Sequence, residues 1–194
     1  ANNLALKGAA VERLIVSAIE HPSVLEAARA SGKTVVEAPV TAAGSIDLAA
    51  LERLLPGPSA LVSVMLANNE TGIIQPLAEV ARLAAGHGAL VHCDAVQALG
   101  KISFDIKALG ADLVSISGHK IGGPKGVGAL VLRDGLNGPE PLLRGGGQEF
   151  GRRAGTENLI GIAGFGAAVA AAMPTLAADM ARVESLRDRL EAGL

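Results

Sequence analysis

Aromatic residues are nearly absent from this sequence. Phe, Trp and Tyr together make up 2% of 194 residues, and Trp and Tyr do not occur at all. Proteins that bind single-stranded nucleic acid stack bases on aromatic side chains, and they bind the phosphate backbone with clustered Lys and Arg. Here the net charge is −2 and no basic block is present. We therefore expect no nucleic acid as a direct partner, and a core built from aliphatic residues.

Cysteine is almost as rare, because Cys93 is the single one. One cysteine allows no internal disulfide, fits a reducing compartment and indicates a cytoplasmic protein. It also forms no zinc-type spacing with the histidines, so no metal site is expected. No secretory leader is visible, and Pro174 interrupts the longest apolar run, so we expect no membrane partner. The sequence begins abruptly at Ala1 without Met, and we expect it to be a piece of a longer protein.

Short apolar segments alternate with segments of helical periodicity along most of the chain. This alternation predicts an α/β fold with three layers, in which helices flank a mostly parallel sheet. The predicted strands are residues 13–18, 34–38, 60–66, 89–94, 111–117 and 127–132. The predicted helices are residues 24–30, 46–55 and 77–85, with the end of another helix at residues 4–10.

The composition of the sequence changes after residue 135. A loop rich in Gly and Arg comes first, then a small-residue helix from Gly161 and a charged amphipathic helix over residues 175–194. We predict that residues 1–165 form one large ligand-binding domain, and that residues 166–194 form a helix leading towards a further, smaller domain. We also expect exposed apolar surface on the final helices, which favours association.

Polar residues follow four of the predicted strands. Because ligands of parallel α/β sheets bind outside the carboxyl ends of strands, these groups are expected to meet in one crevice if the strand ends are neighbours. The four groups are Glu20 and His21; Asn68, Asn69 and Glu70; Asp94 through Gln97; and Ser117, His119 and Lys120.

The glycine-rich stretch of residues 115–126 carries the densest set of reactive side chains. Free backbone N–H groups, a hydroxyl, an imidazole and an ammonium group together suit an anionic group such as phosphate. Lys120 has two interpretations: it forms a Schiff base with a carbonyl cofactor, or it is a solvated loop lysine. A nucleotide P-loop is excluded, because Gly123 is followed by Pro124 and not by Lys.

Asp94 is the only carboxylate that closes an apolar strand. It is a candidate to hold a protonated pyridine nitrogen, which pyridoxal chemistry needs; the alternative is a cap for the following turn. His21 is a candidate to lie on a ring or to move protons, or is a structural histidine before a helix. His92, His87 and Cys93 are interpreted as structural, with Cys93 in the core on the opposite sheet face from Asp94.

Six motifs occur in a fixed order along the chain, and the ordered set is more specific than any member. It closely resembles the cysteine desulfurases, which are pyridoxal-phosphate enzymes of the class V aminotransferase group, and within them the NifS/IscS-type branch. The motifs are Glu20-His-Pro-Ser-Val24, Asn68-Asn-Glu-Thr-Gly72, His92-Cys-Asp-Ala-Val-Gln97, Ser115-Ile-Ser-Gly-His-Lys120 with Gly123-Pro-Lys-Gly126, Gly145-Gly-Gly-Gln-Glu149 and Arg153-Ala-Gly-Thr-Glu-Asn158.

The resemblance implies the large domain of fold type I of the pyridoxal-phosphate-dependent transferases, incomplete here, and a role for each matched residue. Lys120 would bind the cofactor covalently and act in catalysis, and His21 would stack on the ring and assist proton transfer. The other implied cofactor contacts are Asp94 to the pyridine nitrogen, Gln97 to the ring hydroxyl, Ser117 and His119 to the phosphate, Asn69 near the substrate carboxylate, and Thr156 to the phosphate of a partner subunit.

The implied reaction converts L-cysteine to L-alanine and leaves sulfur as a persulfide on an enzyme cysteine, for iron–sulfur cluster or other sulfur-compound assembly. The implied partners are a second copy of the chain and a sulfur-acceptor or scaffold protein. In the family, the persulfide cysteine and the substrate-carboxylate arginine follow the matched motifs, and a phosphate-binding threonine precedes them; none lies within these residues. Gly122 stands where many relatives have Tyr.

We therefore expect these residues alone not to complete desulfuration. Selenocysteine lyase, class V aminotransferase and a non-catalytic scaffold of the same fold remain as alternatives.

Overall fold

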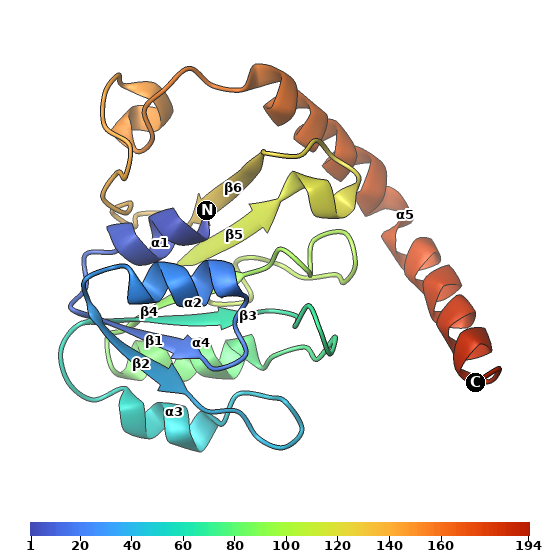
Figure 1. Cartoon of the computed structure of the whole chain (residues 1–194), viewed down its shortest axis with the longest axis horizontal. Coiled ribbons are helices and arrows are strands. Elements are labelled where there is room, and N and C mark those ends of the chain that lie inside the picture. The colour runs from blue at the N-terminus through green and yellow to red at the C-terminus, as the bar shows by residue number, and fades with distance from the viewer.

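A single six-stranded sheet organises the structure, a computed structural model that describes residues 1–194 (Figure 1). The strand order is β2-β1-β3-β4-β5-β6, and every neighbouring pair is parallel except β5 and β6. The predicted mostly parallel sheet is thus confirmed. The strands are β1 (Arg13–Ser17), β2 (Thr34–Ala38), β3 (Ala60–Met65), β4 (Leu90–Asp94), β5 (Leu113–Ser117) and β6 (Gly128–Leu132).

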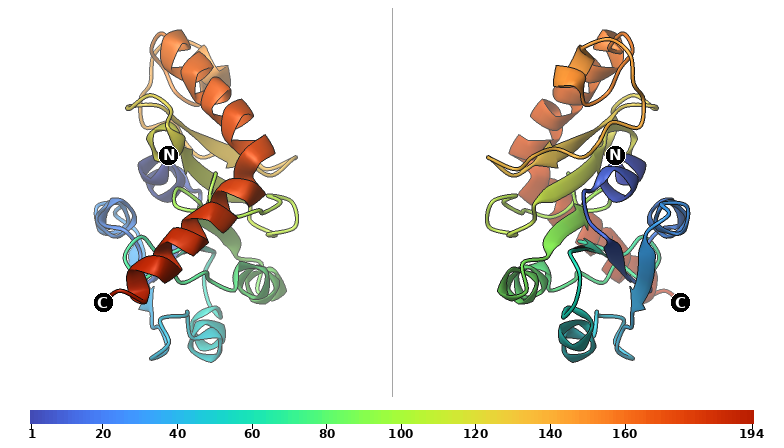
Figure 2. Two further views of the ribbon diagram at one scale, coloured as in Figure 1. Left: turned by 90° about the vertical axis from the view of Figure 1, so that its right-hand side faces the viewer. Right: turned by 90° about the vertical axis from the view of Figure 1, so that its left-hand side faces the viewer.

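Helices cover both faces of the sheet, which confirms the three layers (Figure 2). Side chains alternate along a strand, so β3 supplies both faces: Leu61 packs in the cluster of α1 and α2, whereas Val62 and Val64 pack in the cluster of α3 and α4. The helices are α1 (Asn2–Gly8), α2 (Pro22–Arg29), α3 (Leu48–Leu54), α4 (Leu77–Gly86) and α5 (Leu159–Glu191), with short 3₁₀ turns η1 (Gly118–Ile121) and η2 (Gln148–Gly151).

Local sequence sets where the helices begin. Pro22 occupies the first turn of α2, where its missing N–H costs nothing, and the His21 side chain accepts from the backbone N–H of Ser23. Asp47 caps α3 by accepting from the N–H of Ala50 at 2.9 Å. The α2 cap places His21 four residues beyond the last residue of β1, Ser17.

The antiparallel strand β6 depends on a glycine. A Cβ atom on Gly128 would lie 2.5 Å from the carbonyl oxygen of Ile116 on β5, closer than real side chains come. Gly126 has φ +79°, a left-handed conformation that favours glycine. These two glycines let the chain reverse after η1 and return along β5, which holds the η1 residues at the sheet end.

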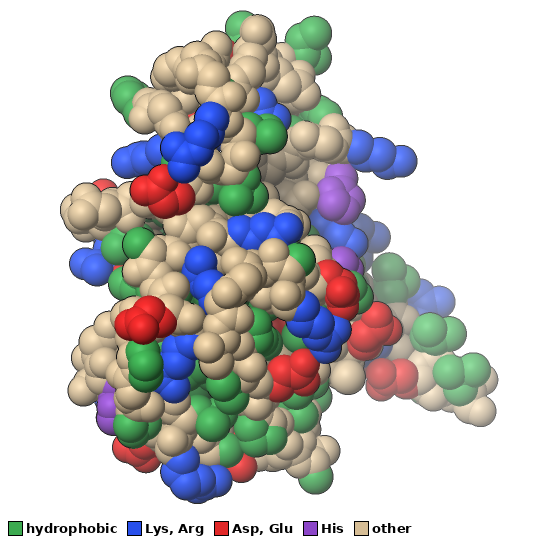
Figure 3. Space-filling model, turned by 60° about the vertical axis from the view of Figure 1, so that its left-hand side comes forward, with side chains coloured by type: hydrophobic (Ala, Val, Ile, Leu, Met, Phe, Trp, Pro, Cys, Tyr) green, Lys and Arg blue, Asp and Glu red, His purple; other side chains and the backbone are tan.

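Charged side chains of both signs are distributed over the surface. Figure 3 shows Lys and Arg side chains interspersed with Asp and Glu side chains over one face of the molecule. That face presents no extended area of one sign, in keeping with the net charge of −2.

Helix α5 is 33 residues long and packs sparsely. Only Gly161, Phe165 and Leu176 are buried on it, and its axis leaves the body of the molecule (Figure 1). The two expected helical segments form one helix that continues through Pro174. The predicted boundary between residues 165 and 166 falls inside this helix, and the division into domains stays a prediction.

Exposed apolar side chains are concentrated on α5, as expected from the sequence. They are Leu159, Ile160, Ile162, Met173, Val183, Leu186 and Leu190. By length and composition α5 is also the one helix that is able to cross a membrane, although a single such helix is weak evidence for a span. The expected absence of a membrane partner stays a prediction.

Candidate functional site

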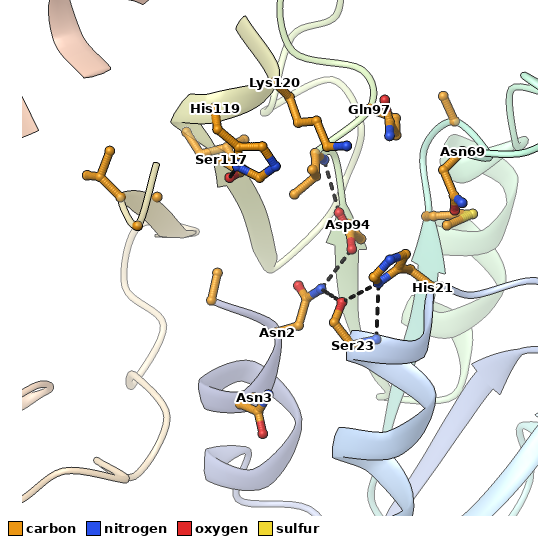
Figure 4. Close-up of a pocket in the computed structure, with 18 residues that line it drawn as sticks. Asn2, Asn3, His21, Ser23, Asn69, Asp94, Gln97, Ser117, His119 and Lys120 are labelled. Atoms are coloured by element: carbon orange, nitrogen blue, oxygen red, sulfur yellow. Dashed lines mark hydrogen bonds between the residues drawn. The ribbon is translucent and has the colours of Figure 1, made fainter. Parts of the chain in front are cut away.

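A cavity of about 620 Å³ lies at the carboxyl ends of β1, β3, β4 and β5 (Figure 4). Its volume falls in the range of small-molecule sites, which is roughly 300–1,000 Å³. It also lies near the point between β1 and β3 where the strand order reverses, the usual ligand position in such sheets. The predicted residues that line it are His21, Asn69, Asp94, Gln97, Ser117, His119 and Lys120.

Four strand ends therefore converge as expected, but some predicted neighbours do not reach the cavity. Glu20 and Asn68 are buried behind it, and Glu70 is exposed outside it. Thr156 is exposed in the loop before α5 and does not line the cavity. Its contact with a partner subunit stays a prediction.

Asp94 ends β4 with its carboxylate held by two donors. Oδ1 accepts from the N–H of Val96 at 3.0 Å, and Oδ2 accepts from Nδ2 of Asn2 at 2.7 Å. The residue is 6% exposed and lines the cavity. Asp94 thus caps the following turn and also lines the cavity, and its role towards a ring nitrogen stays a prediction.

A buried polar layer lies across the sheet beside Asp94. His92 bridges Ser63 on β3 and Ser115 on β5, with Nδ1 and Nε2 at 2.8 and 2.9 Å from the two hydroxyls. Burial lowers the pKa of His92 to about 4, so the ring is neutral. The structural interpretation of His92 is confirmed. Cys93 points to the other face, is 0% exposed, and burial raises the pKa of its thiol, which suits a core residue.

Glu20 is a buried carboxyl group just behind the cavity. Its Oε1 accepts from the N–H of Met65 at 2.6 Å, and its Oε2 has no partner. Burial raises the pKa of Glu20 well above its ordinary value, and the negative charge of Asp94 raises it further. A protonated Glu20 adds no second negative charge beside Asp94 and links the start of α2 to the end of β3.

The η1 turn presents its side chains to the cavity from the other side. Ser117 Oγ and His119 Nδ1 lie 2.8 Å apart. Figure 4 shows the Lys120 side chain reaching over Asp94 towards Gln97. Gln97 accepts from Lys101 at 2.8 Å, and the pKa of Lys101 is lowered by burial and then by the charge of Lys120. Two ammonium groups therefore share this side of the site.

Three residues join the site without having been predicted. Asn2 contacts both Asp94 and Ser23, at 2.7 and 2.9 Å, and Ser23 lies 2.9 Å from the imidazole of His21. Lys101 holds Gln97. Ser23 was considered only as a helix-start signal, and Asn2 lies 92 residues before its partner. No local pattern indicates the contacts of Asn2, because they depend on how α1, α2 and β4 are arranged. The contacts of Ser23 with His21 and of Lys101 with Gln97 are local, at two and four residues apart.

The donors and acceptors around the cavity are chemically complementary to a ligand with three features. Asp94 suits a cationic ring nitrogen, Lys120 suits a carbonyl carbon, and the Ser117–His119 pair on its glycine-rich turn suits an anionic group. The Oδ1 atom of Asn2 also lines this region, buried and without a partner.

Comparison with known families and proteins identifies relatives of the chain. The model of the family described as Aminotransferase class-V matches residues 1–194. The chain is 47% identical to "Cysteine desulfurase NifS" of Azotobacter vinelandii over 184 residues, which is 93% of this chain and 46% of that protein.

Solved structures share the fold of this chain. The NifS-like protein from Rickettsia africae has a TM-score of 0.94 at 38% identity, over 99% of this chain and 54% of that one. The structure titled "SspA in complex with cysteine" has a TM-score of 0.79 at 38% identity, over 87% of this chain and 51% of that one. The chain thus spans about half the length of these proteins.

Proposed function

Because the chain belongs to the class-V aminotransferase family, we propose that it carries the cofactor site of a pyridoxal-phosphate-dependent cysteine desulfurase. The observation that carries the proposal is the convergence of Asp94, Lys120 and the Ser117–His119 pair on one cavity of suitable size. The similarity to proteins named cysteine desulfurase favours this activity over selenocysteine lyase, other aminotransferase chemistry and a non-catalytic scaffold.

The residues present fit pyridoxal phosphate. In the proposed site Asp94 binds the pyridine nitrogen, with its carboxylate fixed by Val96 and Asn2. Ser117 and His119 bind the phosphate, and Gln97 lies on the side of the ring hydroxyl. Lys120 would hold the cofactor covalently, His21 would lie against the ring, and Asn69 would contact the substrate side.

Bound pyridoxal phosphate supplies an electron sink that makes the Cα–H bond of an amino acid acidic. Lys120, which lines the cavity, would move the Cα proton through its Nζ atom once the amino group of the substrate has replaced it on the cofactor. Met65, Val96 and Val127 give the cavity part of its apolar lining.

The proposed substrate is L-cysteine, and the sulfur is carried by a cysteine other than Cys93. Cys93 is 0% exposed and its thiol pKa is raised, so it supplies no thiolate to the cavity. Desulfuration by residues 1–194 alone is therefore not expected. We propose a cytoplasmic homodimer in which Thr156 reaches the partner's cofactor phosphate, and transfer of sulfur to an acceptor or iron–sulfur scaffold protein.

The test is the visible absorption spectrum of the purified chain after addition of pyridoxal phosphate and desalting. We expect a yellow band that persists in the native chain and is absent from Lys120→Ala. Lys125→Ala is the matched control, because Lys125 is also exposed on the same loop but does not line the cavity. A band retained in Lys120→Ala and lost in Lys125→Ala would overturn the assignment of the lysine.

A further inference from the structure

The first turn of α1 and the first turn of α2 are joined to Asp94 by a continuous chain of hydrogen bonds. Asn2 Nδ2 lies 2.7 Å from Asp94 Oδ2 and 2.9 Å from Ser23 Oγ, and Ser23 Oγ lies 2.9 Å from His21 Nδ1 (Figure 4). The backbone N–H of Ser23 also donates to His21 Nδ1, at 3.1 Å. Four residues from α1, β4 and the start of α2 thus form one network.

The direction of every bond in this network is determined by which groups are able to accept. An amide NH₂ group only donates, so Asn2 donates to both Asp94 and Ser23. The opposite amide orientation would place the Asn2 oxygen against a carboxylate oxygen, two acceptors with no proton between them. Ser23 Oγ, having accepted from Asn2, uses its own proton towards His21 Nδ1.

The network therefore decides which tautomer a neutral imidazole adopts. A backbone N–H has no capacity to accept, so the Nδ1 atom that receives it carries no proton. Neutral His21 then bears its proton on Nε2. No hydrogen bond within the chain uses Nε2, and His21 lines the cavity, so this N–H is available to a ligand.

We infer that His21 serves the reaction as a neutral hydrogen-bond donor through Nε2, and that Ser23 and Asn2 are positioning residues that keep it in this form. The inference rests on the proposed function for the identity of the ligand. The acceptor is an anionic oxygen or sulfur atom of the bound cofactor or substrate.

This role differs from that of a proton carrier. Loss of the Nε2 proton would leave an imidazolate, and gain of a proton at Nδ1 would break the bond that caps α2. A neutral imidazole at a helix start is known to act as an electrophile in this manner. The Cα proton is therefore moved by Lys120 Nζ, while His21 stabilises negative charge that develops near its N–H.

The test is nitrogen NMR of the chain labelled with ¹⁵N-histidine, at about pH 8, above the ordinary histidine pKa of ~6.5. Long-range ¹H–¹⁵N correlations distinguish the two neutral tautomers and the imidazolium ion. The chain has four histidines, and the His21 signals are those missing from His21→Gln. We expect the Nε2–H pattern in the free chain, and the same tautomer after addition of pyridoxal phosphate. An Nδ1–H form, a mixture of tautomers, or an imidazolium ion after addition would overturn the inference.

Two variants test the positioning residues. Ser23→Ala removes one of the two donors to Nδ1, and a hydrogen bond is worth about 0.5–1.5 kcal/mol, so the ratio of Nε2–H to Nδ1–H forms should fall about two- to tenfold. Ser23→Thr keeps the hydroxyl and should restore the native ratio. Ser31→Ala, in the turn just after the same helix, is the matched control. Identical spectra for Ser23→Ala and the native chain would overturn the role of Ser23.

Asn2→Ala removes the donor that orients the Ser23 hydroxyl, and should shift the ratio in the same direction by a smaller factor. Asn3→Ala is its control, because Asn3 is exposed beside it and makes no hydrogen bond through its side chain. An Asn2→Ala spectrum identical to that of Asn3→Ala would remove Asn2 from the network. Failure of the proposed function has a separate signature: no visible band forms with pyridoxal phosphate, while the tautomer of the free chain is unaffected.

Discussion

Residues 1–132 and residues 133–194 differ in how much of their apolar surface they bury. The first region contains the whole sheet, four helices and both apolar clusters. The second has no strand, and its 33-residue helix buries three residues. Both regions are rich in aliphatic residues, yet only the first covers them with its own elements.

The difference teaches that apolar composition alone does not produce a core. In the first region each strand presents side chains to two helical layers, and the cavity is fixed because four strand ends are held in register. In the second region α5 meets little more than the η1 turn, through contacts such as Phe165 against Gly118. Most helical stability in proteins comes from packing of one face, and α5 has little of it.

The largest expected effect compares one buried and one exposed aliphatic side chain. Leu61→Ala, at a residue that is 0% exposed on a central strand, should lower the free energy of unfolding by about 2–5 kcal/mol. Ile160→Ala, at a residue that is 87% exposed on α5, should change it by less than ~0.5 kcal/mol. Urea unfolding at one protein concentration measures both. Equal costs would contradict the contrast between the regions.

A smaller effect is expected on ligand binding. Asp94→Asn keeps the side-chain shape but removes the charge, and charge-assisted hydrogen bonds are about twice as strong as neutral ones. The affinity for pyridoxal phosphate should fall by about tenfold or more, or ~1.4 kcal/mol, in an absorbance titration. Asp188→Asn, on the exposed end of α5, should leave the titration unchanged. A loss of affinity in both variants would point to a general effect of charge.

The buried Glu20 predicts a pH dependence of stability. Its pKa is raised in the folded state, so its carboxyl stabilises the fold fully below the ordinary value of 4.5. This contribution is lost progressively as pH rises from there towards the folded pKa. Glu20→Gln keeps an acceptor for Met65 without titrating, so its stability relative to the native chain should be greater at pH 8 than at pH 5.

Chemical unfolding at the two pH values measures this difference. Glu157→Gln, at an exposed residue of the second region, is the control and should show no such change. A relative stability of Glu20→Gln that is the same at both pH values would mean that Glu20 is ionised in the folded chain.

The smallest effect on global stability is expected at Pro174 within α5. Proline supplies no N–H to the carbonyl of Ala170 and costs about 3 kcal/mol in a helix interior. Pro174→Ala should slow hydrogen exchange in the following turns by at least about tenfold, yet change global unfolding by less than ~0.5 kcal/mol. A large rise in global stability would mean that α5 unfolds together with the sheet.

Much of the fold was predictable because it depends on local patterns. Alternating apolar segments located every strand, and the convergence of polar strand ends located His21, Asp94 and Lys120 in one cavity. The orientation of β6 and the continuity of α5 through Pro174 were not evident, because tertiary contacts and not local propensity determine them. The contacts of Asn2 and Glu20 were missed for the same reason.

The bond between Asn2 and Asp94 has a consequence for how the chain acquires its site during synthesis. The two residues are separated by 92 positions, about twice the 47 positions between Arg13 on β1 and its partner Ala60 on β3. In a chain synthesised from its amino end, Asn2 lacks its partner Asp94 until strands β1 to β4 have been made. Contacts that close such long loops form slowly. The crevice is therefore complete only when segments from Asn2 to Gly128 are all present, so a ligand bound there gives no help to the pairing of the first strands on a nascent chain.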